Sequence, residues 1–377
     1  MDQENWGKLI SGHKRGPGAV LLRSFLIIAA AGYSCAVRLR NLLYSKGLLK
    51  THGADAAVFS IGNITTGGTG KTPLVIWLCN LLKERNMRCA ILTRGYKAVQ
   101  NSKCVFTTSG KDGFKIQNYG DEPAVIAESC PHATVIVKSD RVAGAAEAVK
   151  RFDAQALIMD DGFQHRRLAR DLDIVTIDAT QPFGYGRLLP AGLLREPIGA
   201  LRRADAFVIT RCDQATEDRL TRLEGKLRSL NPNAAIARSI HALRHIKCAD
   251  GIELGVDTLK NKKVFAFCGI GNPQAFFTTI TDAGACLVGR QIFDDHYRYT
   301  ESCMTQIHDH ATRYKADIIL TTQKDWTKIA RLRTIRRDIP FGCLAVKIAF
   351  LSGEDELIAL IEGTLAGKIQ PVKKQGG

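Results

Sequence analysis

The chain has 377 residues, which is too long for one ordinary domain, and its 45% hydrophobic and 24% charged residues are typical of a folded globular protein. Lysine and arginine outnumber aspartate and glutamate by 53 to 37, and the net charge of +16 suits a membrane surface, a nucleic acid or a phosphorylated substrate. The 11 cysteines include no C-x-x-C pair, which excludes a zinc knuckle or a thioredoxin-like motif. The basic residues are dispersed rather than interleaved with aromatic side chains, so no nucleic-acid partner is expected.

The first unusual segment is apolar and lies at residues 19–37. It contains SFLIIAAAGYSCAV, a run without a charge between Arg23 and Arg38, and more basic residues flank it on both sides. We predict a membrane-associated helix within residues 1–50, lying on or dipping into an anionic membrane surface. Because the uncharged run is shorter than the roughly 20 residues of a spanning helix, a buried core helix is the alternative.

From residue 56 onward, strand-like runs alternate with helical stretches. The apolar runs are rich in β-branched residues, as in a parallel sheet that is covered on both faces: AAVFSIG, RCAILTRG, ATVIVK, ALIMDDG, LDIVTIDA and AFVITRC. This alternation predicts an α/β fold with a doubly wound, mostly parallel sheet of the P-loop NTPase type. A polar helix and the turn NPN follow, and then a second set of strands. We therefore predict a P-loop domain at residues 51–240 and a smaller α/β domain at residues 241–377.

A candidate phosphate-binding loop joins the first strand to its helix, in the stretch SIGNITTGGTGKTPLVIWL. The glycines allow backbone N–H groups to turn toward phosphate oxygens, Lys71 can reach the β- and γ-phosphates of ATP, and the Thr72 hydroxyl can coordinate Mg²⁺. Thr65 stands where the pattern G-x-x-x-x-G-K-[ST] has its first glycine, so a plain Gly/Thr-rich turn is the alternative. The predicted nucleotide-binding residues are Thr65, Thr66, Gly67, Gly68, Thr69, Gly70, Lys71 and Thr72.

A second acidic element follows the strand in ALIMDDG. Asp160 and Asp161 lie at the carboxyl end of that strand, where ligands bind in open α/β sheets, and either carboxylate can hold Mg²⁺. These two motifs predict a P-loop enzyme that uses ATP and Mg²⁺. They do not decide between a kinase and an ATPase switch that acts on a protein or membrane partner.

Other charged residues lie at predicted helix starts and in loops. Asp121 opens a predicted helix and is a candidate site residue, with helix capping as the alternative. Arg141 opens another predicted helix, where its charge and the helix N-terminus favour binding of an anion. His296 follows two aspartates in FDDHYRY and is a candidate general base, because a carboxylate partner orients the ring and raises its basicity.

Taken together, a series of motifs resembles the tetraacyldisaccharide 4'-kinase family, the lipid A 4'-kinases, over most of the chain. In chain order these motifs are GNITTGGTGKTP, RGY, GDEP, SDR, DDGFQH, PAGLLREP, GIGNP, DHYRY and TTQKD. The family's own loop has threonine where Thr65 stands. Gln323 departs from the family pattern, which has an acid at that position.

The resemblance implies transfer of a phosphoryl group from ATP to the 4'-hydroxyl of the lipid A disaccharide 1-phosphate, at the cytoplasmic face of the inner membrane. It implies that Asp121 and His296 activate the hydroxyl and that Lys71 serves catalysis. It further implies the following metal and phosphate residues: Thr72, Asp160, Asp161 and Glu196 near the metal, and Arg141 and Arg195 near phosphates.

Overall fold

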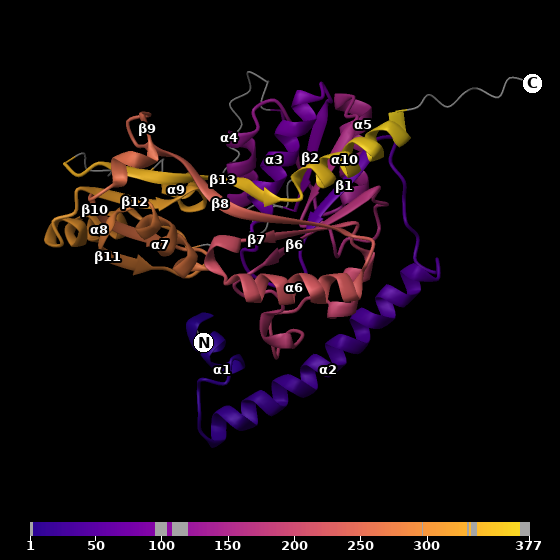
Figure 1. Ribbon diagram of the computed structural model, residues 1–377, viewed down its shortest axis with the longest axis horizontal. Helices are drawn as coiled ribbons and strands as arrows, with labels where there is room; N and C mark the ends of the chain where they lie inside the picture. The colour runs from indigo at the N-terminus through magenta and orange to yellow at the C-terminus, as the bar shows by residue number, and fades with distance from the viewer. Residues whose placement is uncertain are drawn as a thin grey trace, which may run out of the picture.

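The computed structural model describes residues 3–94, 104–107, 120–295, 297–329, 332 and 338–369. Within them, one continuous sheet runs through the molecule in the order β11-β10-β12-β13-β8-β7-β6-β1-β5-β2-β4-β3, with β9 beside β8 (Figure 1). Its strands are β1 Ala57–Gly62, β2 Cys89–Thr93, β3 Cys104–Thr107, β4 Thr134–Val137, β5 Ala156–Asp160, β6 Leu172–Asp178, β7 Ala206–Thr210, β8 Ala235–Cys248, β9 Glu253–Leu254, β10 Lys263–Cys268, β11 Cys286–Ile292, β12 Ile318–Thr322 and β13 Phe341–Ser352.

Helices cover both faces of this sheet (Figure 1). The α-helices are α1 Gln3–Ile10, α2 Pro17–Ser45, α3 Lys71–Glu84, α4 Asp121–Ser129, α5 Arg141–Phe152, α6 Glu217–Leu230, α7 Pro273–Asp282, α8 Glu301–Arg313, α9 Gln323–Ile329 and α10 Glu354–Ile369, and short 3₁₀ turns lie at η2 Gly184–Gly186, η3 Ile198–Arg203, η4 Cys212–Gln214 and η5 Val256–Leu259. Most neighbouring strands are parallel, whereas β3 with β4, β9 with β8 and β13 with β8 are antiparallel. The predicted α/β fold with a mostly parallel sheet is confirmed.

We call β1 to β7 and the helices packed on them the first lobe, and β10 to β12 with α7, α8 and α9 the second lobe. The long strand β8 pairs with β7 at its start and with β13 further along, so it belongs to both lobes. The predicted boundary at residues 240 and 241 therefore falls inside a strand. After β13 the chain returns to the first lobe, because α10 packs into its core.

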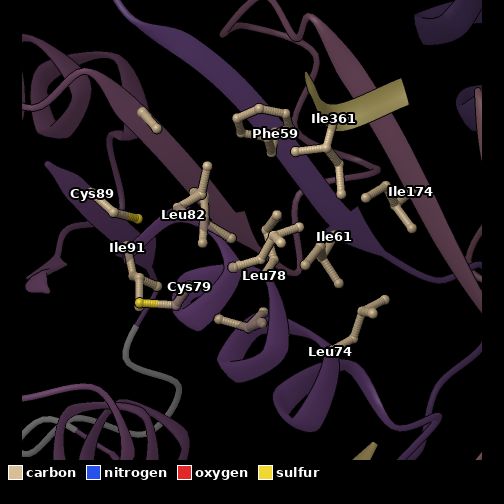
Figure 2. Packing of buried hydrophobic residues seen from close by; sticks show 14 of the residues in the cluster. Phe59, Ile61, Leu74, Leu78, Cys79, Leu82, Cys89, Ile91, Ile174 and Ile361 are labelled. Carbon is tan, nitrogen blue, oxygen red and sulfur yellow. The ribbon is translucent and has the colours of Figure 1, made fainter. Parts of the chain in front are cut away.

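The first-lobe core forms because β1 is apolar on both sides. Phe59 and Ile61 point to the face covered by α3 and α10, while Val58 points to the opposite face. Figure 2 shows Leu74 and Leu78 of α3 packed beside Ile61 of β1. Burying one face of α3 in this way fixes the direction of its first turn, which is where the candidate phosphate loop ends.

The predicted apolar segment at the N-terminus is helix α2, which contains 29 residues and is long and apolar enough to cross a membrane by length and composition. Only 11% of its most apolar window is buried. Its exposed large apolar side chains are Val20, Leu21, Leu22, Phe25, Ile27, Ile28, Leu39 and Leu42. The alternative of a buried core helix is therefore wrong.

The second half of α2 is held on the first lobe by polar contacts. The Tyr33 hydroxyl donates to the Arg195 carbonyl at 2.9 Å, and Arg40 pairs with Glu196 at 2.9 Å. The Asn41 amide also donates to Glu196, at 3.1 Å. The helix is thus attached through polar groups, and its apolar side chains remain largely outside the core.

Because Leu78 is fully buried between α3 and the sheet, the Leu78→Ala variant is expected to lose about 3 kcal/mol of unfolding free energy through lost contacts and a cavity. Chemical denaturation of both proteins measures this difference. The control is Leu351→Ala, because Leu351 is 58% exposed and its truncation should change stability by less than about 0.5 kcal/mol. Equal effects of the two substitutions would contradict this description of the core.

Candidate functional site

The candidate phosphate loop lies between the end of β1 and the start of α3, as predicted. Gly67 and Gly70 have φ values of 107° and 84°, which favour glycine. A Cβ atom at Gly70 would also lie 2.5 Å from Nε2 of His241 and 3.1 Å from Cγ2 of Thr210. Any other residue at position 70 would therefore be strained in its backbone and would collide with β8.

Hydrogen bonds to neighbouring strands fix the shape of this loop. The Asn63 amide donates to the Thr69 hydroxyl at 2.8 Å, and that hydroxyl lies 2.8 Å from the hydroxyl of Thr176 on β6. Arg211 donates to the Gly68 carbonyl at 2.8 Å. Thr65 is 5% exposed and forms a backbone bridge with Leu194, so it belongs to the wall of the loop rather than to a flexible turn.

The loop opens into a cavity of about 1460 Å³, larger than most small-molecule sites. All eight residues predicted to bind the nucleotide line it, together with Asn272 and Lys324 of the second lobe. The same cavity reaches Ile10 of α1 and Tyr33 of α2. It therefore connects the phosphate loop, the second lobe and the N-terminal helices.

The structure brings the acidic pair Asp160 and Asp161 to the phosphate loop. Lys71 lies 3.3 Å from Asp161, and Arg195 donates to both oxygens of the same carboxylate, at 2.7 and 2.9 Å. Burial acts to raise the pKa of Asp161, but the charges of Lys71 and Arg195 outweigh burial and hold that pKa below its usual range.

Asp160 lies in a different environment although it is the adjacent residue. It is 6% exposed, and the Thr93 hydroxyl donates to its carboxylate at 3.1 Å. Burial, with the nearby negative charge of Asp161, raises the pKa of Asp160 to about 6. The two neighbouring carboxylates thus differ in charge in mildly acidic solution.

The oxygen atoms around the loop suit Mg²⁺, which prefers one or two protein carboxylates together with water and substrate phosphates. Asp160, Asp161 and Thr72 supply such oxygens along the cavity wall. Among the described residues no cluster of three or more His, Cys, Asp or Glu side chains could hold a metal by itself. The donor set therefore fits a cation that the nucleotide phosphates help to bind.

Glu196 is not placed with these two carboxylates. It is fully buried, and its oxygens accept from Arg40 at 2.9 Å, Asn41 at 3.1 Å and Arg203 at 3.0 Å. These partners link α2 to η3, and Glu196 does not line the cavity. The arrangement gives Glu196 a role in attaching α2, and it does not support the predicted role in metal binding.

The two arginines predicted near phosphates both line the cavity, and both already have partners. Arg141 is 3% exposed and donates to the carbonyls of Lys138 and Asp160, at 2.6 and 3.2 Å. Burial lowers the pKa of Arg141 to about 10, so the guanidinium remains charged at neutral pH. Arg195 pairs with Asp161, and this contact connects the loop around Arg195 to the acidic pair.

Asp121 begins α4 and faces the second lobe, where Lys328 of α9 lies 3.1 Å from its carboxylate. The next residue, Glu122, pairs with Lys324 at 2.9 Å, and Lys324 also pairs with Asp295 at 3.0 Å. His296 lies outside the described residues, so its predicted pairing with Asp121 stays a prediction. Sequence analysis did not identify Lys328 as a site residue, and Lys324 entered it only as part of the motif TTQKD, just after β12.

The fold and the phosphate loop place this chain in the class of P-loop proteins, with a cavity shaped for nucleotide phosphates. The comparison with protein families is more specific. Residues 22–366 match the family model of tetraacyldisaccharide-1-P 4'-kinase, LpxK. The chain therefore belongs to this family, the 4'-kinases of the lipid A precursor, and is a phosphotransferase. Membership confirms the predicted family and the predicted kinase activity, so the ATPase switch is set aside.

Individual relatives agree over nearly their whole lengths. The chain is 36% identical over 373 residues to the tetraacyldisaccharide 4'-kinase of Halothermothrix orenii, covering 94% of this chain and 96% of the relative. It is 37% identical to the same enzyme of Anaeromyxobacter sp. strain Fw109-5, with 94% and 95% covered. The crystal structure of LpxK from Aquifex aeolicus in complex with ATP has a TM-score of 0.70 and 32% identity, covering 91% of this chain and 99% of that one.

The raised pKa of Asp160 predicts a pH effect on stability. Between the unfolded pKa near 4 and the folded pKa of about 6, the folded state binds more protons, so the stabilisation from protonated Asp160 is lost as pH rises. Relative to Asp160→Asn, the wild type should lose about 2 kcal/mol of unfolding free energy between pH 4 and pH 7. Denaturation in Mg²⁺-free buffer measures this loss. The control is Asp282→Asn, at an exposed aspartate, which should lose the same unfolding free energy between pH 4 and pH 7 as the wild type. An equal loss in Asp160→Asn would contradict the prediction.

Proposed function

We propose that this chain transfers the γ-phosphoryl group of ATP to the 4'-hydroxyl of the tetraacyldisaccharide 1-phosphate precursor of lipid A, giving the 1,4'-bisphosphate and ADP. Family membership supports this reaction, and one structural observation supports the proposal that this chain catalyses it. The cavity at the phosphate loop continues to the N-terminal helices, so a lipid headgroup and a nucleotide can share it. Incubation with ATP and the tetraacyl disaccharide 1-phosphate, followed by mass spectrometry, should show one added phosphate.

The phosphate loop and α3 would bind the nucleotide. Backbone N–H groups of residues 67–72 surround the phosphates at the start of α3, where the helix dipole favours negative charge. Lys71 balances the charge that develops on the transferred group. Asp161 holds Lys71 and Arg195 within the cavity, because it pairs with both.

Thr72, Asp160 and Asp161 are the residues that would hold Mg²⁺. When bound, the ion would neutralise negative charge on the nucleotide phosphates. Asp160 must lose its proton to contribute a negative oxygen, and without the ion burial and Asp161 raise its pKa to about 6. Its partner Thr93 orients the carboxylate.

We assign acceptor activation to Asp121 and His296. Asp121 starts α4 in the first lobe, and His296 follows Asp295 in the second lobe, so the two lobes would each contribute one residue. The pair accepts the proton of the 4'-hydroxyl while its oxygen bonds to the γ-phosphorus and the bond to ADP breaks. Approach of the two lobes would exclude water that otherwise hydrolyses ATP.

Asp121→Asn and His296→Ala are expected to lower kcat by about 10² to 10⁴, because each removes part of the proton acceptor. The KM for ATP should change little, since neither residue belongs to the phosphate loop. Transfer of ³²P from labelled ATP to the lipid measures both constants. The exposed aspartate variant Asp282→Asn should retain full activity, and wild-type kcat in both site variants would disprove this assignment.

We further propose that α2 places the enzyme on the cytoplasmic face of the inner membrane. Its exposed leucine, isoleucine and phenylalanine side chains can enter the lipid, and the flanking lysines and arginines can meet anionic headgroups. The hydrogen bonds from Tyr33 and Arg40 to residues 195 and 196 keep the cavity beside the membrane surface.

The triple variant Leu21→Ser, Phe25→Ser, Ile28→Ser should bind anionic vesicles at least tenfold more weakly, since each change removes roughly 1.5–3 kcal/mol of apolar burial in lipid. Co-sedimentation with vesicles measures this affinity, and a soluble short-chain acceptor checks that catalysis is retained. The matched control replaces Ile252, Tyr314 and Leu351, which are exposed apolar residues outside α2, with serine. Unchanged vesicle binding in the α2 variant would contradict the proposal.

A further inference from the structure

Two lysines of the second lobe contact two consecutive acidic residues of the first lobe. Lys324 and Lys328 are four residues apart on α9 and therefore share one face of that helix. Lys324 lies 2.9 Å from Glu122, and Lys328 lies 3.1 Å from Asp121. Both acids lie in the first turn of α4. The contact is an ion-pair cluster between the lobes, formed from two short helices.

These ion pairs are largely shielded from water. The side chains of Lys328 and Asp121 are 13% and 18% exposed, and those of Lys324 and Glu122 are 20% and 29% exposed. Burial acts to lower the pKa of Lys324, but Glu122 and Asp295 outweigh it and hold that pKa above its usual range. Solvent screens such pairs less than exposed pairs, so each fixes the position of its partner more strongly.

The second lobe holds Lys328 in place independently of the first lobe. Its ammonium lies 3.2 Å from Asp325, which is fully buried. Asp325 in turn accepts from the Gly269 backbone N–H at 2.9 Å and from the Thr322 hydroxyl at 2.8 Å. A fixed cation on the second lobe therefore meets Asp121 only where the two lobes are together.

Lys324 makes the corresponding contact with α4 one turn earlier on α9. Besides Glu122 it pairs with Asp295 at 3.0 Å, and Asp295 immediately precedes His296 in the chain. Removing either lysine would leave carboxylates of α4 facing carboxylates of the second lobe, which repel one another. The cluster thus contains Asp121 and reaches Asp295, the residue that precedes His296 in the chain.

We propose that Lys324 and Lys328 are positioning residues for phosphoryl transfer: they hold α4 against the second lobe, with Lys328 orienting Asp121 and Lys324 fixing the segment that leads to His296. This inference rests on the proposed catalytic function of Asp121 and His296. It assigns to α9 the coupling between lobe contact and activation of the acceptor hydroxyl.

The test is a double-mutant cycle on kcat with Lys328→Met, Asp121→Asn and the double variant. Lys328→Met should lower kcat by about 100-fold, because a misplacement of about 1 Å costs that much. The KM values for ATP and lipid should stay unchanged, because Lys328 positions another residue rather than binding substrate. In the Asp121→Asn background the same substitution should have little further effect. Lys328→Arg, which keeps the charge, should restore much of the activity.

Several outcomes would overturn the proposal. An unchanged kcat in Lys328→Met would do so, as would the same loss with and without Asp121, or a raised KM with unchanged kcat, which would indicate direct substrate binding. Lys260→Met removes a lysine that pairs with Asp257 outside the cluster and should leave kcat unchanged. Equilibrium ATP binding shows whether each variant is folded.

The same experiments distinguish this inference from the proposed function. Failure of Asp121→Asn to lower kcat would remove the proposed catalytic role itself. A large effect of Asp121→Asn with no effect of Lys328→Met would remove only the positioning role. A parallel cycle with Lys324→Met and Glu122→Gln applies the same criterion to the second pair, and additive losses there would overturn the role of Lys324.

Discussion

The rest of the structure depends on the pairing of β8, which hydrogen-bonds with β7 in the first lobe and with β13 as it enters the second. The lobes are therefore joined by a strand and not by a flexible linker. That strand also carries His241, whose ring occupies the space beside Gly70 of the phosphate loop. Burial, with the nearby charge of Arg211, lowers the pKa of His241 to about 3, so the ring packs against the loop in its neutral form. The strand that joins the lobes thus also packs against the phosphate loop.

The structure gives different surroundings to carboxylates that look alike in the sequence. Asp161 and Glu196 both contact guanidinium groups, but Asp161 lines the cavity while Glu196 attaches α2. Asp160 has a raised pKa, whereas that of its neighbour is lowered. Environments that push neighbouring pKa values apart allow neighbouring acids to serve different functions. Here one acid organises the cations of the site, and the other can bind or release a proton near pH 6.

The parts that sequence predicted well depend on local patterns. The strand, glycine-rich loop and helix from residue 57 to residue 84 follow from apolar runs and from glycines with positive φ. Threonine at position 65, in place of the usual first glycine, was predicted only through the family resemblance. Its backbone forms a bridge with Leu194, which is far along the chain and cannot be inferred from the local pattern. The structural role of Glu196 could not be foreseen, since its partner Arg40 is 156 residues away. The contact of Lys328 with Asp121 likewise exists only through the fold, because α4 and α9 belong to different lobes.

The return of α10 to the first lobe has a consequence for synthesis of the chain. Leu357, Ile361 and Leu365 belong to the same core as Phe59 of β1, so this core combines residues that are synthesised before the second lobe with residues that are synthesised after it. While the ribosome is still adding the second lobe, the α10-facing side of the early strands lacks its cover. Such exposed apolar surface is what chaperones bind and what favours aggregation. Synthesis of the first lobe therefore begins before that of the second lobe, but its core can be completed only after α10 has left the ribosome.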